Sequence, residues 1–222
     1  MKYKIKAFTL TELLIALGII GTIAAISIPS LMNTINNRLL ATQLKSNVTA
    51  IQQLASDKLV TDKVRSLEDT DFKSATTLLN EGNFSIAKIC DSASACWDQE
   101  YKRLSDLNVT TRTPGGTEGN IRTAFLKNGA LLSYSTNSLN LSDGDKTVGN
   151  FYIDVNGRDK PNILGRDYFC FYITGKGKII DAWTANNKPT PSDTQLLNGC
   201  KDASTMTGCL TYIQQQGWVI NY

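Results

Sequence analysis

One carboxylate stands alone in a long apolar segment near the start of the chain. Glu12 is the only charged residue between Phe8 and Leu31. The segment is long enough to cross a bilayer, which takes about 20 residues. An unpaired ionised group near hydrocarbon costs on the order of 3 kcal/mol or more. We therefore predict that Glu12 is a functional residue with a charge partner still to be identified.

The other chemistry-bearing residues do not form the pattern of an active site. The chain has no histidine for general base work, and it has no Gly-x-Ser-x-Gly sequence, phosphate-binding loop or metal-ligand cluster. Paired carboxylates carry no weight in a chain with 20 acidic residues. We predict that the protein is not an enzyme.

The densest polar motif of the second half contains Asp154, Asn156, Asp159 and Asp167. These residues supply the oxygen ligands that calcium prefers. Their spacing is not that of an EF-hand, because glycine occupies the fourth position and no glutamate follows in register. The sequence favours a turn in which Asx side chains bond to backbone amides. We therefore predict no cofactor, with calcium as the alternative.

The elements that position these residues begin with a long helix. After Pro29 the pattern changes from uniformly apolar to amphipathic, which marks one face of a helix. A single helix from Phe8 to Leu59 would be on the order of 75 Å long, too long to be buried in a domain of this size, so its first half must project. The apolar positions of the second half are Leu31, Ile35, Leu39, Leu44, Val48, Ile51, Ala55 and Leu59.

The second half of the chain has the period and the turns of an antiparallel sheet. Asn128-Gly129 predicts a hairpin between Arg122–Leu126 and Ala130–Tyr134, because Asn-Gly accepts the positive φ values of tight turns. A sheet of four or five strands is predicted, and the amphipathic half of the helix supplies the apolar stripe that such a sheet must cover. The further strand candidates are Phe151 to Val155, Tyr168 to Thr174 and Lys178 to Ala182.

Three shorter elements are also predicted. Ser66-Leu67-Glu68-Asp69 has the signature of a capped helix start. Asp98 to Leu107 is expected to hold a short helix. Trp218, Ile220 and Tyr222 alternate, which predicts a closing strand that packs its aromatic side chains.

The segment from Lys6 to Glu12, followed by the apolar helix, resembles the prepilin-type cleavage and methylation signal of type IV pilins and type II secretion pseudopilins. The resemblance implies that a prepilin peptidase cuts between Ala7 and Phe8 and methylates the new amino terminus at Phe8. It also implies that Glu12, the fifth residue after the cut, pairs with the amino terminus of a neighbouring subunit during filament assembly. The chain departs from the family at Ala7, where the family usually has glycine, which puts the rate of processing in question.

Two simpler interpretations compete with this resemblance. An ordinary secretory signal needs a basic start and an apolar core, and both are present. Such a signal would be cut after the core, near Ala25, and would leave Glu12 unexplained. A plain membrane anchor also fits the hydropathy of the segment.

Charge indicates how the chain is oriented. Three of the 23 basic residues are Lys2, Lys4 and Lys6, so a chain that begins at Phe8 has 20 basic and 20 acidic residues. A neutral chain gives no indication of nucleic acid binding. The three lysines fit the positive-inside rule, which keeps the amino end cytoplasmic and sends the rest outward.

Five cysteines in an exported domain indicate disulfides. Because the number is odd, at least one is free or pairs between chains. We predict the local pairs Cys90 with Cys96 and Cys200 with Cys209, and expect Cys170 to be a small apolar residue of a buried strand. A zinc site is the alternative, but the chain has no Cys-x-x-Cys spacing and no histidine.

The sequence as a whole predicts an α+β, pilin-like protein with a leader (1–7), a transmembrane or filament-core half of the helix (8–30) and a globular domain (31–222). We expect a subunit of a type IV pilus or type II secretion pseudopilus that crosses the inner membrane once, with its domain outside the cytoplasm. The implied partners are prepilin peptidase, copies of itself or related pilins, the inner-membrane assembly platform and, before assembly, membrane lipid. The alternatives are a competence pilin for DNA uptake and a membrane-anchored binding domain that does not polymerise.

Overall fold

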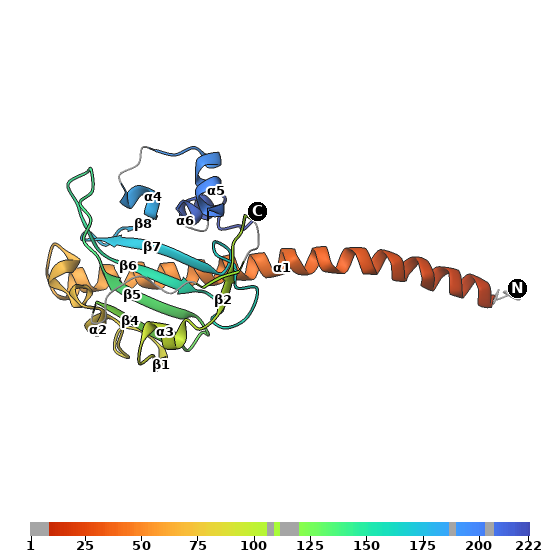
Figure 1. Cartoon of the computed structure of the whole chain (residues 1–222), viewed down its shortest axis with the longest axis horizontal. Helices are drawn as coiled ribbons and strands as arrows, with labels where there is room; N and C mark the ends of the chain where they lie inside the picture. The colour runs from red at the N-terminus through yellow and green to blue at the C-terminus, as the bar shows by residue number, and fades with distance from the viewer. Residues whose placement is uncertain (1–8, 106–108, 112–119, 187–189, 203–206) are drawn as a thin grey trace, which may run out of the picture.

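A single long helix, α1 (Leu10–Thr61), runs through the molecule and projects far beyond it (Figure 1). The computed structural model describes residues 9–105, 109–111, 120–186, 190–202 and 207–222. The long helix predicted from the sequence is confirmed, and it continues through Pro29 without interruption. It ends at Asp62, whose backbone N–H donates to the carbonyls of Lys58 and Val60.

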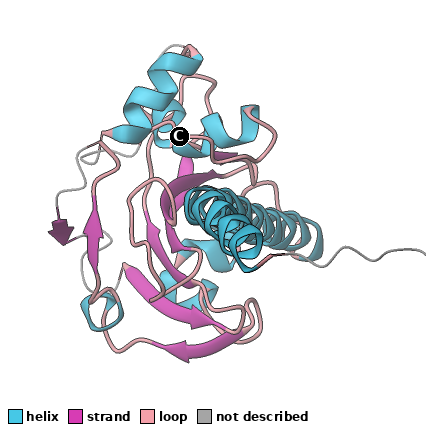
Figure 2. Cartoon of the chain, turned by 90° about the vertical axis from the view of Figure 1, so that its right-hand side faces the viewer, coloured by secondary structure: helices cyan, strands magenta, loops and turns pink. Residues whose placement is uncertain are grey.

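Burial divides α1 into two parts. The buried part begins at Leu40, which is later than the amphipathic pattern indicates, because Leu31, Ile35 and Leu39 are about half exposed or more. Figure 2 looks along α1 and shows the sheet curving around it. The buried residues of α1 are Leu40, Ala41, Leu44, Asn47, Val48, Ile51 and Ala55.

The main sheet is antiparallel and has six strands in the order β1-β4-β5-β6-β7-β8. It contains one strand more than the largest number predicted, because β1 was not recognised in the sequence. The strands are β1 (Ile86–Ile89), β4 (Ile121–Leu126), β5 (Leu131–Thr136), β6 (Thr147–Asp154), β7 (Tyr168–Thr174) and β8 (Ile179–Ile180).

The predicted hairpin is confirmed as β4 and β5. Gly129 has a φ of 92°, in the left-handed region that the turn requires. Asn128 also links this turn to the helix, because its Nδ2 donates to Oδ1 of the buried Asn47 at 3.0 Å. The Asn-Gly pair therefore both forms the turn and holds it against α1.

The face of the sheet that meets α1 is aromatic. Tyr134, Phe151 and Phe171 lie side by side on β5, β6 and β7, and all three are fully buried. Phe72 packs edge-on against Tyr134, whose hydroxyl donates to the Phe72 carbonyl at 2.7 Å. Burying one such side chain contributes on the order of 1.5 to 3 kcal/mol, so this row is a major source of stability.

The capped start predicted at Ser66 is confirmed, because its hydroxyl accepts from the Glu68 N–H at 3.3 Å, but the helix that follows is short. The segment after Ser66 forms two 3₁₀ turns, η1 (Leu67–Asp69) and η2 (Asp71–Lys73), and the four-residue helix α2 (Ala75–Leu78). Ser66 and Thr70 each cap only one turn, which stops the longer helix from forming.

The expected helix at Asp98–Leu107 is replaced by β2 (Glu100–Lys102), which pairs with β3 (Val109–Thr111) and follows the short helix α3 (Ala93–Cys96). Tertiary contacts decide this conformation. Trp97 packs edge-on against Tyr168 of β7, and its indole N–H donates to Ser133 Oγ at 2.7 Å.

The carboxyl-terminal part adds small helices, and its described residues, 207–222 included, do not form the predicted closing strand. It contains α4 (Ala182–Ala185), α5 (Asp193–Lys201) and α6 (Cys209–Gln215). The residues of the tail make separate contacts with the domain. Ile220 is buried, and the Tyr222 hydroxyl donates to the Gly165 carbonyl at 2.6 Å. Trp218 has a φ of 65°, which an extended strand does not allow.

Candidate functional site

The start of α1 holds the carboxylate of Glu12 in a capping box with Thr9. The Thr9 backbone N–H and hydroxyl donate to Glu12 Oε2 at 2.9 and 2.8 Å, and the Glu12 N–H donates back to the Thr9 hydroxyl at 3.2 Å. Thr-x-x-Glu is the sequence signature of this cap, and it was overlooked because Glu12 was considered only as a charge in an apolar segment. Both bonds from Thr9 go to the same oxygen, Oε2. Among the described residues, Oε1 has no recorded partner.

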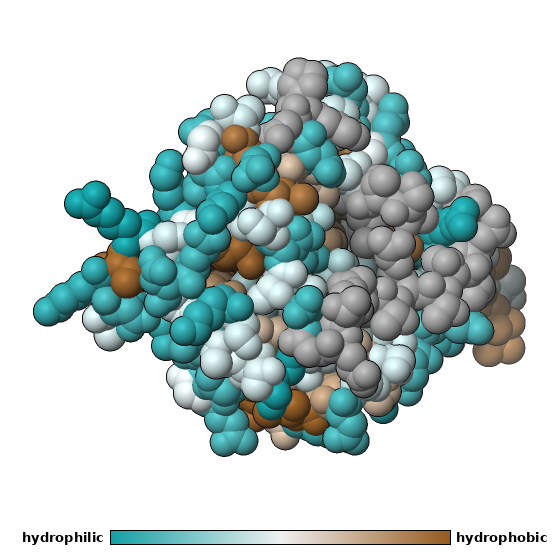
Figure 3. Space-filling view, turned by 60° about the vertical axis from the view of Figure 1, so that its left-hand side comes forward, coloured by the Kyte–Doolittle hydropathy of each residue, from teal (hydrophilic) through white to brown (hydrophobic). Residues whose placement is uncertain are grey.

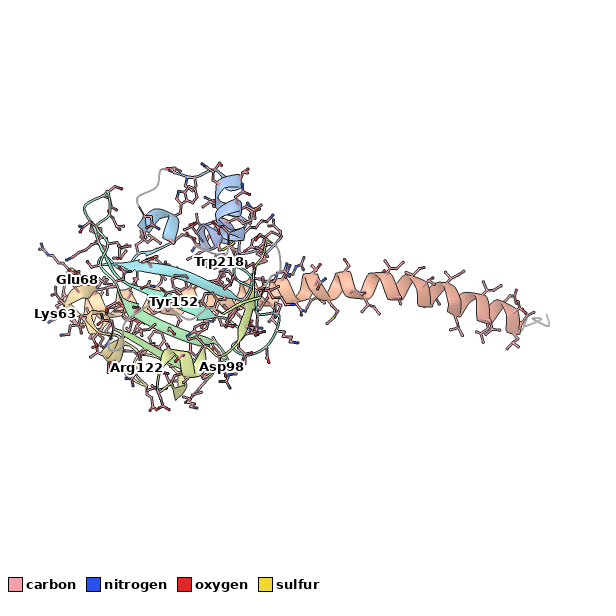
Figure 4. All side chains as sticks on the ribbon, in the orientation of Figure 1. Lys63, Glu68, Asp98, Arg122, Tyr152 and Trp218 are labelled. Atoms are coloured by element: carbon pink, nitrogen blue, oxygen red, sulfur yellow. A yellow bond between two sulfur atoms is a disulfide. The ribbon has the colours of Figure 1, made fainter. Side chains whose placement is uncertain are left out.

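Glu12 lies at the end of a helix half that is apolar on all sides. In Figure 4 the side chains of this half stand clear of the domain. Among the described residues, α1 is the one helix long and apolar enough to cross a membrane, and its most apolar 18-residue window is wholly unburied, with a mean hydropathy of 2.2. Its large apolar residues Leu10, Leu13, Leu14, Ile15, Leu17, Ile19, Ile20, Ile23, Ile26, Ile28 and Leu31 are each at least 53 % exposed.

The globular part has a different surface. In the space-filling view of Figure 3, the face outside the grey atoms is largely hydrophilic and its apolar patches are small and separate. A continuous apolar surface of the size found on α1 is not stable in water, so it must be covered by lipid or by protein.

Comparison with protein families matches residues 2–28 to the prokaryotic N-terminal methylation motif. The chain carries the signature of type IV pilins and pseudopilins. Ala7 and Phe8, between which the predicted cleavage falls, are inside the matched range and outside the residues that the structure describes. No curated protein and no solved structure matched the chain.

The fold agrees with this signature. A long amino-terminal helix followed by an antiparallel sheet is the α+β arrangement expected of a pilin-like precursor. Pilins and pseudopilins are structural subunits, so the signature indicates no enzymatic activity.

Two disulfides join the cysteine pairs expected from the sequence of this pilin-like precursor. Cys90 and Cys96 are bonded across the start of α3, and Cys200 and Cys209 join α5 to α6. Cys170 lies on β7 and takes part in neither disulfide. It is half-buried and not fully buried as expected, because it lies on the face of the sheet opposite α1.

Two fully buried carboxyl groups lie at the two ends of the loop between β6 and β7: Asp154 is the last residue of β6, and Asp167 directly precedes β7. Asp154 accepts from the Tyr101 hydroxyl at 2.6 Å and from the Asn156 N–H at 3.2 Å. Asp167 accepts from the N–H groups of Asn162 and Ile163 at 2.5 and 2.6 Å. Both carboxyl groups therefore bond to backbone amides as the Asx-turn interpretation predicts, and Asp154 also bonds to the hydroxyl of a strand that is distant in sequence.

Burial changes the protonation of this pair. It raises the pKa of Asp154 to about 8, and the charge of Asp167 adds to the rise. Burial also raises the pKa of Asp167 to about 6, against the opposing effect of its backbone donors. The pKa of Tyr101 is raised as well, chiefly by burial, so its hydroxyl remains a donor.

The other two calcium candidates are less buried, although the backbone N–H of Asn156 donates to Asp154. Asn156 donates through Nδ2 to the carbonyls of Asp159 and Lys160 at 2.9 and 3.1 Å, and Asp159 is exposed. Among the described residues, no three carboxylate, cysteine or histidine side chains form a group that could hold a metal ion. The loop thus has the arrangement of a hydrogen-bonded turn.

Asp181 is a structural residue that the sequence analysis did not identify. Its carboxylate caps α4 by accepting from the Trp183 N–H at 2.9 Å. It also accepts from the N–H groups of Gly208 and Leu210, at 2.6 and 3.1 Å, at the start of α6. Burial raises the pKa of Asp181 and these donors oppose the rise. An Asp before a short helix was visible in the sequence, whereas its contact with α6 was not.

Proposed function

We propose that the chain is a filament subunit of a type IV pilus or type II secretion pseudopilus that polymerises through the projecting half of α1. The observation that carries this proposal is the combination of an exposed apolar helix half with a capped carboxylate at its start. A membrane covers such a surface before assembly, and the same half of neighbouring subunits covers it in a filament.

Processing prepares the carboxylate for assembly. Cleavage between Ala7 and Phe8 by prepilin peptidase creates a positively charged amino group four residues before Glu12. Glu12 Oε2 is held by Thr9, which leaves Oε1 to accept from the amino group of an adjacent subunit. In a low-dielectric filament core an unpaired charge is costly, so this ion pair sets the axial register of the subunits.

The test separates the charge of Glu12 from its role as a cap. Glu12→Gln keeps an oxygen that can accept from Thr9 and removes the charge, whereas Thr9→Ala removes the capping hydroxyl and keeps the charge. We expect Glu12→Gln to reduce filament yield at least tenfold, with normal membrane insertion and an unchanged domain. Thr9→Ala is expected to retain most filaments, and Glu81→Ala, at an exposed position of the domain, to retain all of them.

Three results would contradict the proposal. Normal filament yield from Glu12→Gln would exclude the ion pair as the assembly contact. Membrane insertion of the wild-type chain without cross-linking between cysteines engineered beside Glu12 would instead favour an anchored domain that does not polymerise. An intact mass that still includes Lys2, Lys4 and Lys6, in cells with active prepilin peptidase, would exclude the processing step.

A further inference from the structure

A groove of about 420 Å³ lies where α1 leaves the domain, and the proposed function does not use it. One wall is the helix, with Asn33, Asn36 and Gln43, and the other is the loop between β6 and β7. Figure 1 shows this loop at the end of the sheet from which α1 projects. The volume is within the range of about 300 to 1,000 Å³ that is typical of small-ligand sites.

Three side chains that line this groove each have a buried polar atom without a hydrogen-bond partner among the described residues: Gln43 Oε1, Asn156 Oδ1 and Arg166 Nε. Asn156 is held in one orientation by its two Nδ2 bonds to backbone carbonyls, so its oxygen must remain the free end. Arg166 is positioned by the bond from its Nη2 to the Tyr222 carbonyl at 2.9 Å. Buried polar groups normally have hydrogen-bond partners. The unpaired atoms of these three side chains therefore indicate a ligand that supplies both a donor and an acceptor.

The groove also contains charges of both signs. Lys160 and Arg166 are cationic and Asp159 is anionic. A ligand that satisfies all of these groups must present an anion to the cations and N–H donors to Asp159 and the two amide oxygens. A phosphate next to a primary ammonium has this combination, and Leu39 and Pro161 provide an apolar border for the carbon atoms that follow.

The position of the groove relative to the membrane indicates where such a ligand comes from. Leu10 to Leu31 spans roughly 32 Å at about 1.5 Å per residue, close to the hydrocarbon thickness of about 30 Å. The polar residues of the groove begin at Asn33, about one half-turn further along α1. When the apolar half is in the bilayer, the groove is therefore at the level of the lipid headgroups.

We propose that this groove binds the phosphoethanolamine headgroup of a phospholipid in the outer leaflet while the subunit is still in the membrane. Lys160 and Arg166 hold the phosphate, and Asp159, Gln43 and Asn156 accept from the ammonium. The inference rests on the membrane insertion contained in the proposed function. The bound lipid fixes the depth and rotation of α1 until the subunit is withdrawn into a filament.

The test measures which lipid stays bound to the full chain. The chain is reconstituted into nanodiscs made from equal amounts of phosphatidylethanolamine, phosphatidylcholine and phosphatidylglycerol with identical acyl chains, and released for native mass spectrometry. We expect phosphatidylethanolamine to be retained about tenfold over each of the others, because phosphatidylcholine has no N–H donors and phosphatidylglycerol has no ammonium.

Variants on the exposed rim of the groove locate the binding. Asp159→Asn and Lys160→Gln are each expected to lower this preference to less than about threefold without changing the fold, because both side chains are exposed. Asp91→Asn and Lys176→Gln make the same changes at exposed positions elsewhere, and we expect them to keep the full preference.

The outcomes distinguish the groove from the proposed function. A chain that inserts into nanodiscs and retains the three lipids equally overturns the groove proposal and leaves the filament proposal intact. A preference that survives both rim variants also overturns it. A chain that does not insert at all contradicts the membrane stage of the proposed function, and with it the headgroup site.

Discussion

Domain stability is expected to fall as pH rises from about 4 to about 8, because of the buried pair Asp154 and Asp167. Their folded pKa values are raised above the ordinary value near 4, so the folded chain binds protons more tightly than the unfolded chain. The stabilisation is fully present below pH 4 and is lost as pH passes the folded values of about 6 and about 8. A rise of the Asp167 pKa from 3.8 to about 6 corresponds to about 3 kcal/mol.

The titration of Asp154 and Asp167 can be measured without interference from histidine, the residue that usually titrates between pH 5 and 8, because the chain has none. Urea unfolding of the full chain in detergent, followed by tryptophan fluorescence, measures the free energy of unfolding at each pH. Buried Trp97 reports directly on the region, since its ring centre is 6.1 Å from that of Tyr101. We expect a loss of at least about 3 kcal/mol between pH 4 and pH 8, which is the contribution of Asp167 alone, and the titration of Asp154 adds to it.

The variant Asp154→Asn/Asp167→Asn removes both titrating groups and should reduce the slope of this dependence, leaving the contribution of Asp181, whose pKa is also raised by burial. Asp159→Asn changes an exposed carboxylate of the same loop and should keep the full slope. Equal slopes in the wild type and in the double variant would refute the reasoning.

Two further substitutions test the packing. Asp181→Ala removes the cap of both α4 and α6, and we expect it to lower the free energy of unfolding by about 2 to 3 kcal/mol, against less than about 0.5 kcal/mol for Asp193→Ala in the exposed first turn of α5. Equal effects in urea titrations would contradict the double cap. Gly149→Ala would place a Cβ 2.3 Å from the ring of buried Tyr134, so we expect about 2 kcal/mol or more of destabilisation in thermal unfolding. An unchanged midpoint would show that the ring can move aside.

Local patterns in the sequence were sufficient to predict the main architecture. The apolar run and the amphipathic pattern after it predicted α1, and Asn128-Gly129 predicted the turn between β4 and β5. The limits of β7 were predicted correctly at Tyr168 and Thr174, because a run rich in aromatic and β-branched residues is bounded there by turn residues. In each case the determining interactions are between residues close in sequence.

The incorrect predictions and the missed site residues depend on distant contacts. Tyr101 and Asp154 are 53 residues apart, so neither gives a local sign of the hydrogen bond that joins them. Asp181 reaches an N–H 29 positions further along the chain. At the end of the chain, alternation of Trp218, Ile220 and Tyr222 suggested a strand, but the tail finds its hydrogen bonds with the β6–β7 loop and not with a neighbouring strand.

The arrangement of the disulfides has a mechanical consequence in the proposed filament, if it is placed under tension. Both bonds are local, with sequence separations of 6 and 9, and neither joins α1 to the sheet. The strands run roughly along α1 (Figure 1), so a pull on the helix loads its whole contact with the sheet in shear. The mechanical strength of the subunit therefore depends on the noncovalent contact from Leu40 to Ala55, including the Asn47 to Asn128 bond, while the disulfides preserve the local folds at either edge.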